Sequence, residues 1–120
     1  MLLTSSMENY LKAILVLHQR HGNARCVDVA DYLGVSKPSV SRAVKELSKS
    51  GHITKKDGIL YLTQQGRQYA EQICERYQFF TARLVDAGVD RKTAEHDACN
   101  IEHAISAEAF QKLKDSLRSK

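Results

Sequence analysis

Residues 27–51 constrain the fold more than any other part of the chain, because they predict two short helices joined by a tight turn. The first helix is expected to end at Gly34, since glycine commonly follows a helix C-terminus. The second is expected to begin after Ser36, whose hydroxyl can accept a hydrogen bond from a backbone N–H of the first turn. Pro38 is tolerated in that turn, and Gly51 ends the helix. These signals predict a helix–turn–helix.

The second of these helices has an apolar stripe at helical spacing, and small polar and basic side chains lie on its other face. A second helix with such residues at its exposed start is the arrangement that reads the DNA major groove. Arg42 can reach O6 and N7 of a guanine, with a phosphate contact as the alternative. The candidate DNA-contacting residues of this helix are Ser36, Lys37, Pro38, Ser39, Ser41, Arg42 and Lys45.

A β-hairpin is expected directly after the second helix. Asp57 and Gly58 form a strong signal for a two-residue hairpin turn, and β-prone residues flank them at 53–54 and 59–62. A small hairpin in this position is typical of the wing of a winged helix. Lys55 and Lys56 at its tip are candidate contacts to phosphate or the minor groove, and such contacts add salt-dependent affinity rather than sequence choice.

Helix-capping signals predict the remaining elements. Ser5, with Glu8 three residues later, resembles a capping box for a first helix that ends before Gly22. Thr63 is expected to cap a long helix that ends before Gly88. Two further helices are expected after the candidate N-caps Asp90 and Ser106.

The expected architecture is therefore mainly α with a small β-hairpin wing. Residues 1–65 are predicted to form a winged helix-turn-helix DNA-binding domain, and residues 66–120 a helical domain. The later helices carry more apolar surface than a lone winged helix needs. They are expected to form the interface of a homodimer, which would read two half-sites of a double-stranded DNA operator.

Composition and charge agree with a DNA-binding protein. Residues 37–56 contain six Lys or Arg and one Glu, and the whole chain of 120 residues has a net charge of +4. No apolar run approaches the ~20 residues that span a membrane, and the N-terminus does not resemble a secretory signal. Three cysteines without a pairing pattern favour a reducing compartment. We expect a cytoplasmic protein without a membrane partner.

A second group of residues carries metal-binding chemistry. Cys99, Glu102 and His103 lie at positions i, i+3 and i+4, which places them on one side of a helix. Thiolate, carboxylate and imidazole can ligate a divalent transition metal, and sulfur favours Fe²⁺, Zn²⁺ or Co²⁺ over Mg²⁺ and Ca²⁺. Three ligands from one helix are not a complete site. The alternative is a buried Cys beside a solvated Glu–His pair.

The same residues allow an enzymatic hypothesis, with Cys99 as nucleophile and His103 as base. Both lie on one expected helix, and the sequence has no evident oxyanion site or substrate pocket. We therefore do not expect an enzyme, and no catalytic residue is predicted.

The order of elements resembles the diphtheria-toxin-repressor family of iron- and manganese-dependent repressors. The strings that carry the resemblance are SMENYLKAI, VADYLGVSKPSVSRAVKEL, LTQQGRQYA and CNIEHAIS, and it runs from about Ser6 to Leu113. It implies a winged-helix domain followed by a helical dimerisation domain. It also implies that metal bound between the first helix and the dimerisation helices sets the DNA-binding geometry. The SH3-like domain of longer relatives is not expected.

Compared residue by residue, the resemblance is partial. Cys99, Glu102 and His103 match the family's primary metal ligands, and Cys at the first position resembles iron-type members. The family's ligand on the first helix corresponds to Asn9, whose amide oxygen is a weak neutral ligand. A second carboxylate on that helix, found in the manganese branch, corresponds to Lys12.

The family's histidine on the long helix corresponds to Tyr77, which implies loss of a second metal site unless Cys74, one turn earlier, replaces it. The resemblance thus implies a metal-dependent repressor of metal-homeostasis genes, with Fe²⁺ favoured and Mn²⁺ or Zn²⁺ as alternatives. The other interpretation is a winged-helix regulator with a reduced or lost metal site. Such a regulator would be constitutive or would respond to redox or another ligand.

Overall fold

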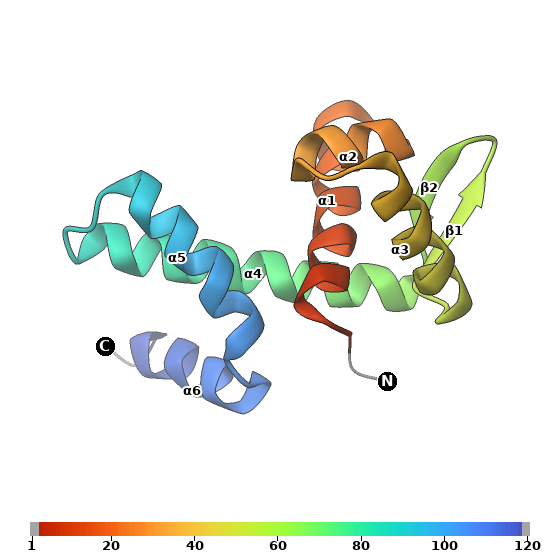
Figure 1. The fold of residues 1–120 in the computed structure, drawn as a ribbon. Coiled ribbons are helices and arrows are strands. Elements are labelled where there is room, and N and C mark those ends of the chain that lie inside the picture. The colour runs from red at the N-terminus through yellow and green to blue at the C-terminus, as the bar shows by residue number, and fades with distance from the viewer. Residues whose placement is uncertain (1–2, 119–120) are drawn as a thin grey trace. The chain divides into compact units, whose positions relative to one another are not determined.

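The computed structural model describes residues 3–118 and contains six helices and one two-stranded hairpin in that range (Figure 1). Residue contacts divide the chain into two compact units, residues 1–72 and 73–120, each with its own packing. The mainly α fold with a small wing is confirmed. No described helix is both long and apolar enough to cross a membrane. The elements are α1 (Ser5–His21), α2 (Cys26–Leu33), α3 (Lys37–Lys49), β1 (Ile53–Lys56), β2 (Ile59–Leu62), α4 (Gln64–Asp86), α5 (Arg91–Ala104) and α6 (Ala107–Arg118).

The cap of α1 differs from the prediction by one residue. Thr4, rather than Ser5, is the N-cap, and its hydroxyl accepts a hydrogen bond from the Met7 N–H at 3.2 Å. Glu8 therefore lies one position beyond the place that a capping box requires, and it is buried in the helix face instead. The other end agrees with the sequence, because Gly22 adopts a left-handed conformation with φ 78°.

The helix–turn–helix forms as predicted. α2 ends at Gly34, whose φ of 68° lies in the region that favours glycine. The Ser36 hydroxyl accepts from the Ser39 N–H at 3.2 Å and so fixes the start of α3. The apolar stripe of α3 is buried and consists of Val40, Ala43, Val44 and Leu47.

One core holds the first unit together. Its fully buried side chains come from several elements, and each such side chain contributes about 1.5–3 kcal/mol when it leaves water. Figure 1 shows α1, α2 and α3 grouped together, with the hairpin beside α3. The largest members are Leu11 and Ile14 of α1, Val29 of α2, Val40 and Leu47 of α3, Ile53 of β1 and Leu60 of β2.

The wing is a short antiparallel hairpin whose turn is the predicted one. Lys56 pairs with Ile59, which leaves Asp57 and Gly58 as the two turn residues. Their φ values of 53° and 78° are those of a type I′ turn, which matches the twist of the strands. Leu60 also donates its N–H to the Ala24 carbonyl at 2.7 Å, which attaches the wing to the segment before α2.

A compact joint connects α3, the wing and the start of α4. The His52 N–H donates to the Leu47 carbonyl at 2.9 Å, and the His52 carbonyl accepts from the Thr63 N–H at 3.1 Å. The Thr63 hydroxyl donates to the Gly51 carbonyl at 2.7 Å and accepts from the Gly66 N–H at 3.1 Å. Gly66 is buried so tightly here that a Cβ would overlap the His52 carbonyl oxygen.

We predict that Gly66→Ala lowers the free energy of unfolding by roughly 1–3 kcal/mol, the range for overpacking a closed site. To relieve the overlap between the new Cβ and the His52 carbonyl, α4 would have to move away from the backbone that precedes the wing. The matched control is Gln68→Ala, because Gln68 is exposed on the same helix. Urea denaturation would measure the free energy of unfolding of both variants. Equal values for the two would contradict the close approach of the backbones at Gly66.

The ring of His52 is buried in the same joint. The Ser50 hydroxyl lies within hydrogen-bond distance of the Leu47 carbonyl, at 3.1 Å, and of His52 Nδ1, at 2.6 Å. The ring of Tyr69 meets His52 edge-on, with centroids 5.8 Å apart. Burial lowers the pKa of His52 below its ordinary value of 6.5.

The lowered pKa of His52 predicts a loss of stability in acid. As the pH falls below 6.5, the unfolded chain takes up a proton that the folded joint resists, so the unfolded state is stabilised relative to the native one. We expect the loss to continue until the pH reaches the folded pKa. Urea midpoints between about pH 8 and pH 5 should fall less for His52→Gln than for the natural protein. His21→Gln, at an exposed histidine, should keep the original pH dependence.

The second unit is built from the rest of α4, α5 and α6. Asp90 caps α5 by accepting from the Thr93 N–H at 3.1 Å, and Ser106 caps α6 by accepting from the Ala109 N–H at 3.1 Å, as predicted. Phe110 of α6 is buried against two rings of α4, with centroids 5.3 Å from Phe79 and 6.0 Å from Phe80. Ala94 and Ala98 of α5 are fully buried small residues.

Candidate metal centre and nucleic-acid interface

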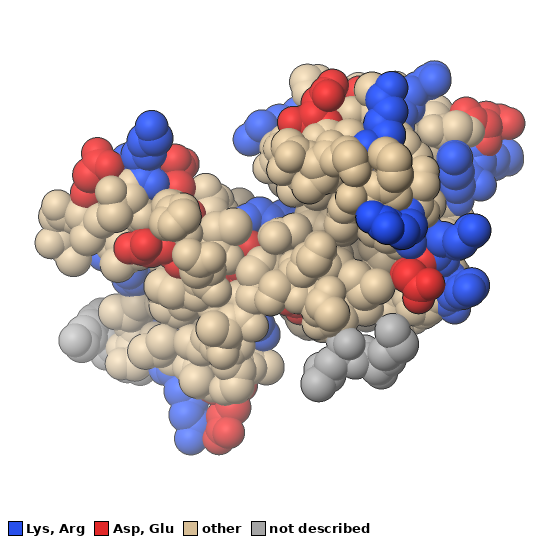
Figure 2. Space-filling model, viewed as in Figure 1, with Lys and Arg blue, Asp and Glu red and all other residues tan. Residues whose placement is uncertain are grey.

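The outer face of α3 is polar and basic. Lys37, Ser41 and Lys45 recur at intervals of four residues, so they share one side of the helix, and Arg42 lies beside them. All four are exposed, as are Pro38 and the wing residues Lys55 and Lys56. Figure 2 shows Lys and Arg side chains gathered over α3 and the wing.

Ser36 and Ser39 differ from the other predicted DNA-contacting residues. Their hydroxyl oxygens are 2.8 Å apart, and Ser36 also accepts from the Ser39 backbone. Both hydroxyls therefore take part in the structure of the helix start. Lys37, Ser41 and Arg42 are exposed polar side chains of the first two turns, which suits contact with base edges.

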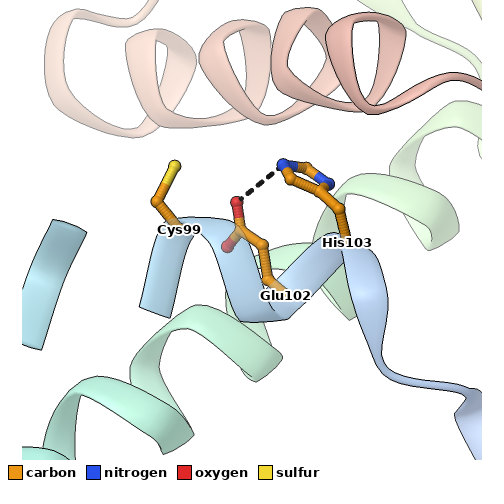
Figure 3. Close-up of side chains that lie close together, drawn as sticks. All are labelled: Cys99, Glu102 and His103. Atoms are coloured by element: carbon orange, nitrogen blue, oxygen red, sulfur yellow. Dashed lines mark ion pairs between the residues drawn. The ribbon is translucent and has the colours of Figure 1, made fainter. Parts of the chain in front are cut away.

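Cys99, Glu102 and His103 come together on α5, as their spacing predicts (Figure 3). Their ligand atoms all lie within 4.8 Å of one another. Oε1 of Glu102 is 3.2 Å from Nε2 of His103, and the two side chains are 0% and 8% exposed. The predicted alternative of a solvated Glu–His pair is wrong, because neither side chain is exposed enough to be solvated.

The three residues fit a divalent transition metal. Bonds of about 2.0–2.3 Å place two ligands of one tetrahedral ion about 3–4 Å apart, so modest side-chain movement would suffice. A carboxylate with no exposed surface is costly to bury unless a cation or hydrogen-bond donors compensate its charge. Thiolate and imidazole beside it are the donors that borderline ions prefer.

Asn9 and Cys74, the remaining candidate ligands, and Lys12 and Tyr77, which replace ligands of the family, lie on other elements. Asn9 and Lys12 are half-buried on α1 in the first unit. Cys74 and Tyr77 are half-buried on α4 in the second unit. Among the described residues, the group on α5 does not include Cys74. The role of Asn9 as a further ligand remains a prediction.

An arginine that the sequence did not single out contacts the end of α5. Nη1 of Arg76, on α4, donates to the Glu102 carbonyl at 3.3 Å and to the Ile105 carbonyl at 3.1 Å. The sequence gives one hint that a side chain from elsewhere binds the end of α5. No glycine follows this helix to satisfy its last carbonyls. This hint does not name the residue that takes the place of glycine.

Both halves of the chain match models of one protein family. Residues 2–58 match the model described as "Iron dependent repressor, N-terminal DNA binding domain". Residues 63–119 match "Iron dependent repressor, metal binding and dimerisation domain". The chain belongs to the iron-dependent repressor family. The resemblance found in the sequence is thereby confirmed.

Relatives of this chain cover almost its whole length. The HTH-type transcriptional regulator MntR of Listeria monocytogenes serotype 4a (strain HCC23) is 35% identical over 113 residues, which are 93% of this chain and 80% of that protein. Two solved structures share the fold. The metal-dependent transcriptional regulator MtsR has a TM-score of 0.87 at 23% identity, over 97% of this chain and 55% of that one. A manganese-dependent transcriptional repressor in complex with manganese has a TM-score of 0.83 at 24% identity, over 92% and 52%.

Membership of the iron-dependent repressor family defines the general function. The chain combines a DNA-binding domain with a domain for metal binding and dimerisation. It is a metal-dependent transcriptional regulator whose partners are DNA and a second copy of itself, and its cofactor is a divalent metal. The family domains are separated at residues 58–63 and the compact units at 72–73, whereas the predicted boundary at residue 65 remains a prediction.

Proposed function

We propose that this protein is a cytoplasmic repressor whose affinity for its operator depends on a divalent ion held by Cys99, Glu102 and His103. The observation that carries the proposal is the meeting of three metal-binding side chains around a carboxylate that is fully buried on α5. These residues lie within the part of the chain that matches the metal-binding and dimerisation domain. Asn9 is proposed as a further, neutral ligand.

Fe²⁺ is the proposed physiological ion. A thiolate ligand at Cys99 favours softer ions, and Fe²⁺ exceeds Mn²⁺ in affinity for a given site with nitrogen, oxygen or sulfur ligands. One structural relative is manganese-dependent, and another relative's structure holds Zn²⁺. Mn²⁺ and Zn²⁺ are therefore the ions against which Fe²⁺ should be compared.

Different residues are proposed to contact the bases and the phosphates of the operator. Lys37, Ser41 and Arg42 of α3 are proposed to meet base edges, and Lys45 and the two wing lysines to contact phosphates. A dimer that reads two half-sites must hold its two α3 helices about 34–36 Å apart, one turn of DNA. When bound, the ion supplies positive charge and directed bonds that hold three side chains of the dimerisation domain in one arrangement. By linkage, the operator must tighten metal binding by the same factor that metal tightens operator binding.

The central test is DNA binding with and without metal. Because the operator sequence is unknown, the probe is a duplex selected from a random-sequence library by the Fe²⁺-loaded protein. We expect Fe²⁺ to tighten binding of this duplex by about 5–150-fold, the usual range of allosteric coupling. The same enhancement should need a lower free concentration of Fe²⁺ than of Mn²⁺. Glu102→Gln should abolish most of the enhancement, whereas Glu108→Gln, at an exposed residue of α6, should retain it. Fluorescence anisotropy would measure the affinities.

Equal affinity of the natural protein for the duplex with and without metal would contradict the proposed switch while leaving DNA binding intact. That result would support the alternative of a constitutive regulator, or of one that responds to redox or another ligand.

The wing lysines generate a separate prediction about salt. Removing one lysine–phosphate interaction should flatten the plot of log affinity against log salt by about 0.9. Replacement of Lys55 and Lys56 by alanine removes two candidate interactions of this kind from each protomer, so the slope of the dimer should fall by about 3–4. Lys92→Ala, at an exposed lysine of α5, is the control and should leave the slope unchanged. An unchanged slope in the wing variant would exclude phosphate binding by these residues.

A further inference from the structure

The C-terminal end of α5 is closed in an unusual way. The last carbonyls of a helix have no partner within the helix, and a left-handed glycine commonly helps to satisfy them. Here Ile105 follows the helix in an extended conformation, with φ −84° and ψ 140°. Its N–H reaches the Ile101 carbonyl at 3.2 Å. The carbonyl of Glu102, the next residue, accepts a hydrogen bond from a side chain of another helix.

That donor is Arg76 of α4. A single guanidinium nitrogen lies within hydrogen-bond distance of the carbonyls of Glu102 and Ile105, at 3.3 and 3.1 Å. A positive charge at a helix C-terminus is stabilising because it faces the negative end of the helix dipole. Arg76 is half-buried, so solvent screens this interaction less than it would at the surface.

The guanidinium group also contacts the third helix of the unit. Its central carbon lies 5.7 Å from the centre of the Phe110 ring on α6. Phe110 is only 5% exposed and packs edge-on against Phe79 of α4. Arg76 therefore joins α4, α5 and α6 at one point, and the aromatic ring limits the positions that its side chain can take.

Two of the three candidate metal ligands lie in the turn that Arg76 closes. Glu102 and His103 are the third-last and second-last residues of α5, whereas Cys99 lies one turn earlier. Helix ends fray when nothing holds them, and fraying here would move two donors away from the third. We propose that Arg76 is a positioning residue for the metal centre, which fixes the last turn of α5 and thereby the directions of Glu102 and His103. This inference rests on the proposed function.

Arginine suits this position better than lysine. The planar guanidinium group is weakly hydrated, stacks on aromatic faces and loses little freedom for each hydrogen bond that it forms. A lysine ammonium at residue 76 would keep the positive charge, but not the planar guanidinium group that lies over the Phe110 ring. Arg76→Lys should therefore hold the last turn of α5 in part, and Arg76→Met should not hold it.

The experiment compares Arg76→Met and Arg76→Lys with Arg83→Met as the matched control. Arg83 lies on the same helix and also packs on a ring, at 5.6 Å from the centre of Phe79, but it pairs with Asp86 of its own helix. Co²⁺ is the probe, because a thiolate–Co²⁺ bond gives an absorption band that reports on Cys99. We expect Arg76→Met to bind Co²⁺ about 10–100-fold more weakly, the usual effect of losing a residue that orients a ligand. The lysine variant should fall between this value and that of the natural protein, and Arg83→Met should match the natural protein.

A second measurement requires no metal. Amide hydrogen exchange in residues 101–106 should be faster in Arg76→Met than in the natural protein, and unchanged in Arg83→Met. Arg76→Lys provides both measurements if the methionine variant does not fold.

The outcomes separate the role of Arg76 from the proposed function. Failure of the natural protein to bind Co²⁺ would overturn the metal centre, and the positioning role with it. Co²⁺ binding by the natural protein with unchanged affinity in both Arg76 variants would overturn the positioning role alone. Weaker Co²⁺ binding without faster exchange would also overturn it, because the effect would not act through the end of α5. Equal losses in Arg76→Met and Arg83→Met would overturn it too, by showing a general loosening of the second unit.

Discussion

Burial of the Glu102 carboxylate places a strong energetic constraint on the second unit. An ionised carboxylate removed from water is destabilising by several kcal/mol unless charges or donors compensate it, and Glu102 has no exposed surface. His103 lies at ion-pair distance from the side chain, and Arg76 hydrogen-bonds the backbone of the same residue. The arrangement suits the proposed metal centre, because a charge is attracted more strongly to a carboxylate that is excluded from water than to one in bulk water.

The first unit is organised around the joint between α3, the wing and α4, where neutral hydrogen bonds and close packing replace charge. The Thr63 N–H donates to the His52 carbonyl and the Thr63 hydroxyl donates to the Gly51 carbonyl. Gly66 allows the two backbones to approach. α3 and the wing are therefore held in a fixed relative position by the same few residues. In the proposed operator complex both elements meet one DNA duplex, so a fixed relation between them reduces the ordering that binding requires.

Local signals in the sequence predicted most elements, because caps and turns depend on neighbours along the chain. Ser36, Asp90 and the Asp57-Gly58 turn act as predicted. The cap of α1 was misplaced because Thr4 and Ser5 are both good N-caps, and the burial of Glu8 distinguishes them. The spacing of Cys99, Glu102 and His103 predicted their meeting, since all three lie on one helix. Arg76 could not be predicted in the same way, because it reaches α5 from 26 and 29 residues away in the sequence.

The start of α3 separates the residues that build the helix from those that face outward. Ser36 and Ser39 hold the N-terminus through their hydroxyls, Pro38 suits the first turn, and the stripe from Val40 to Leu47 holds the helix in the core. Substitutions at exposed positions away from such features usually change stability by no more than about 0.5 kcal/mol. Lys37, Ser41 and Arg42 can therefore vary between descendants of this protein with little loss of fold. With the proposed base contacts of these residues, operator preference can change through them while the scaffold that presents them stays the same.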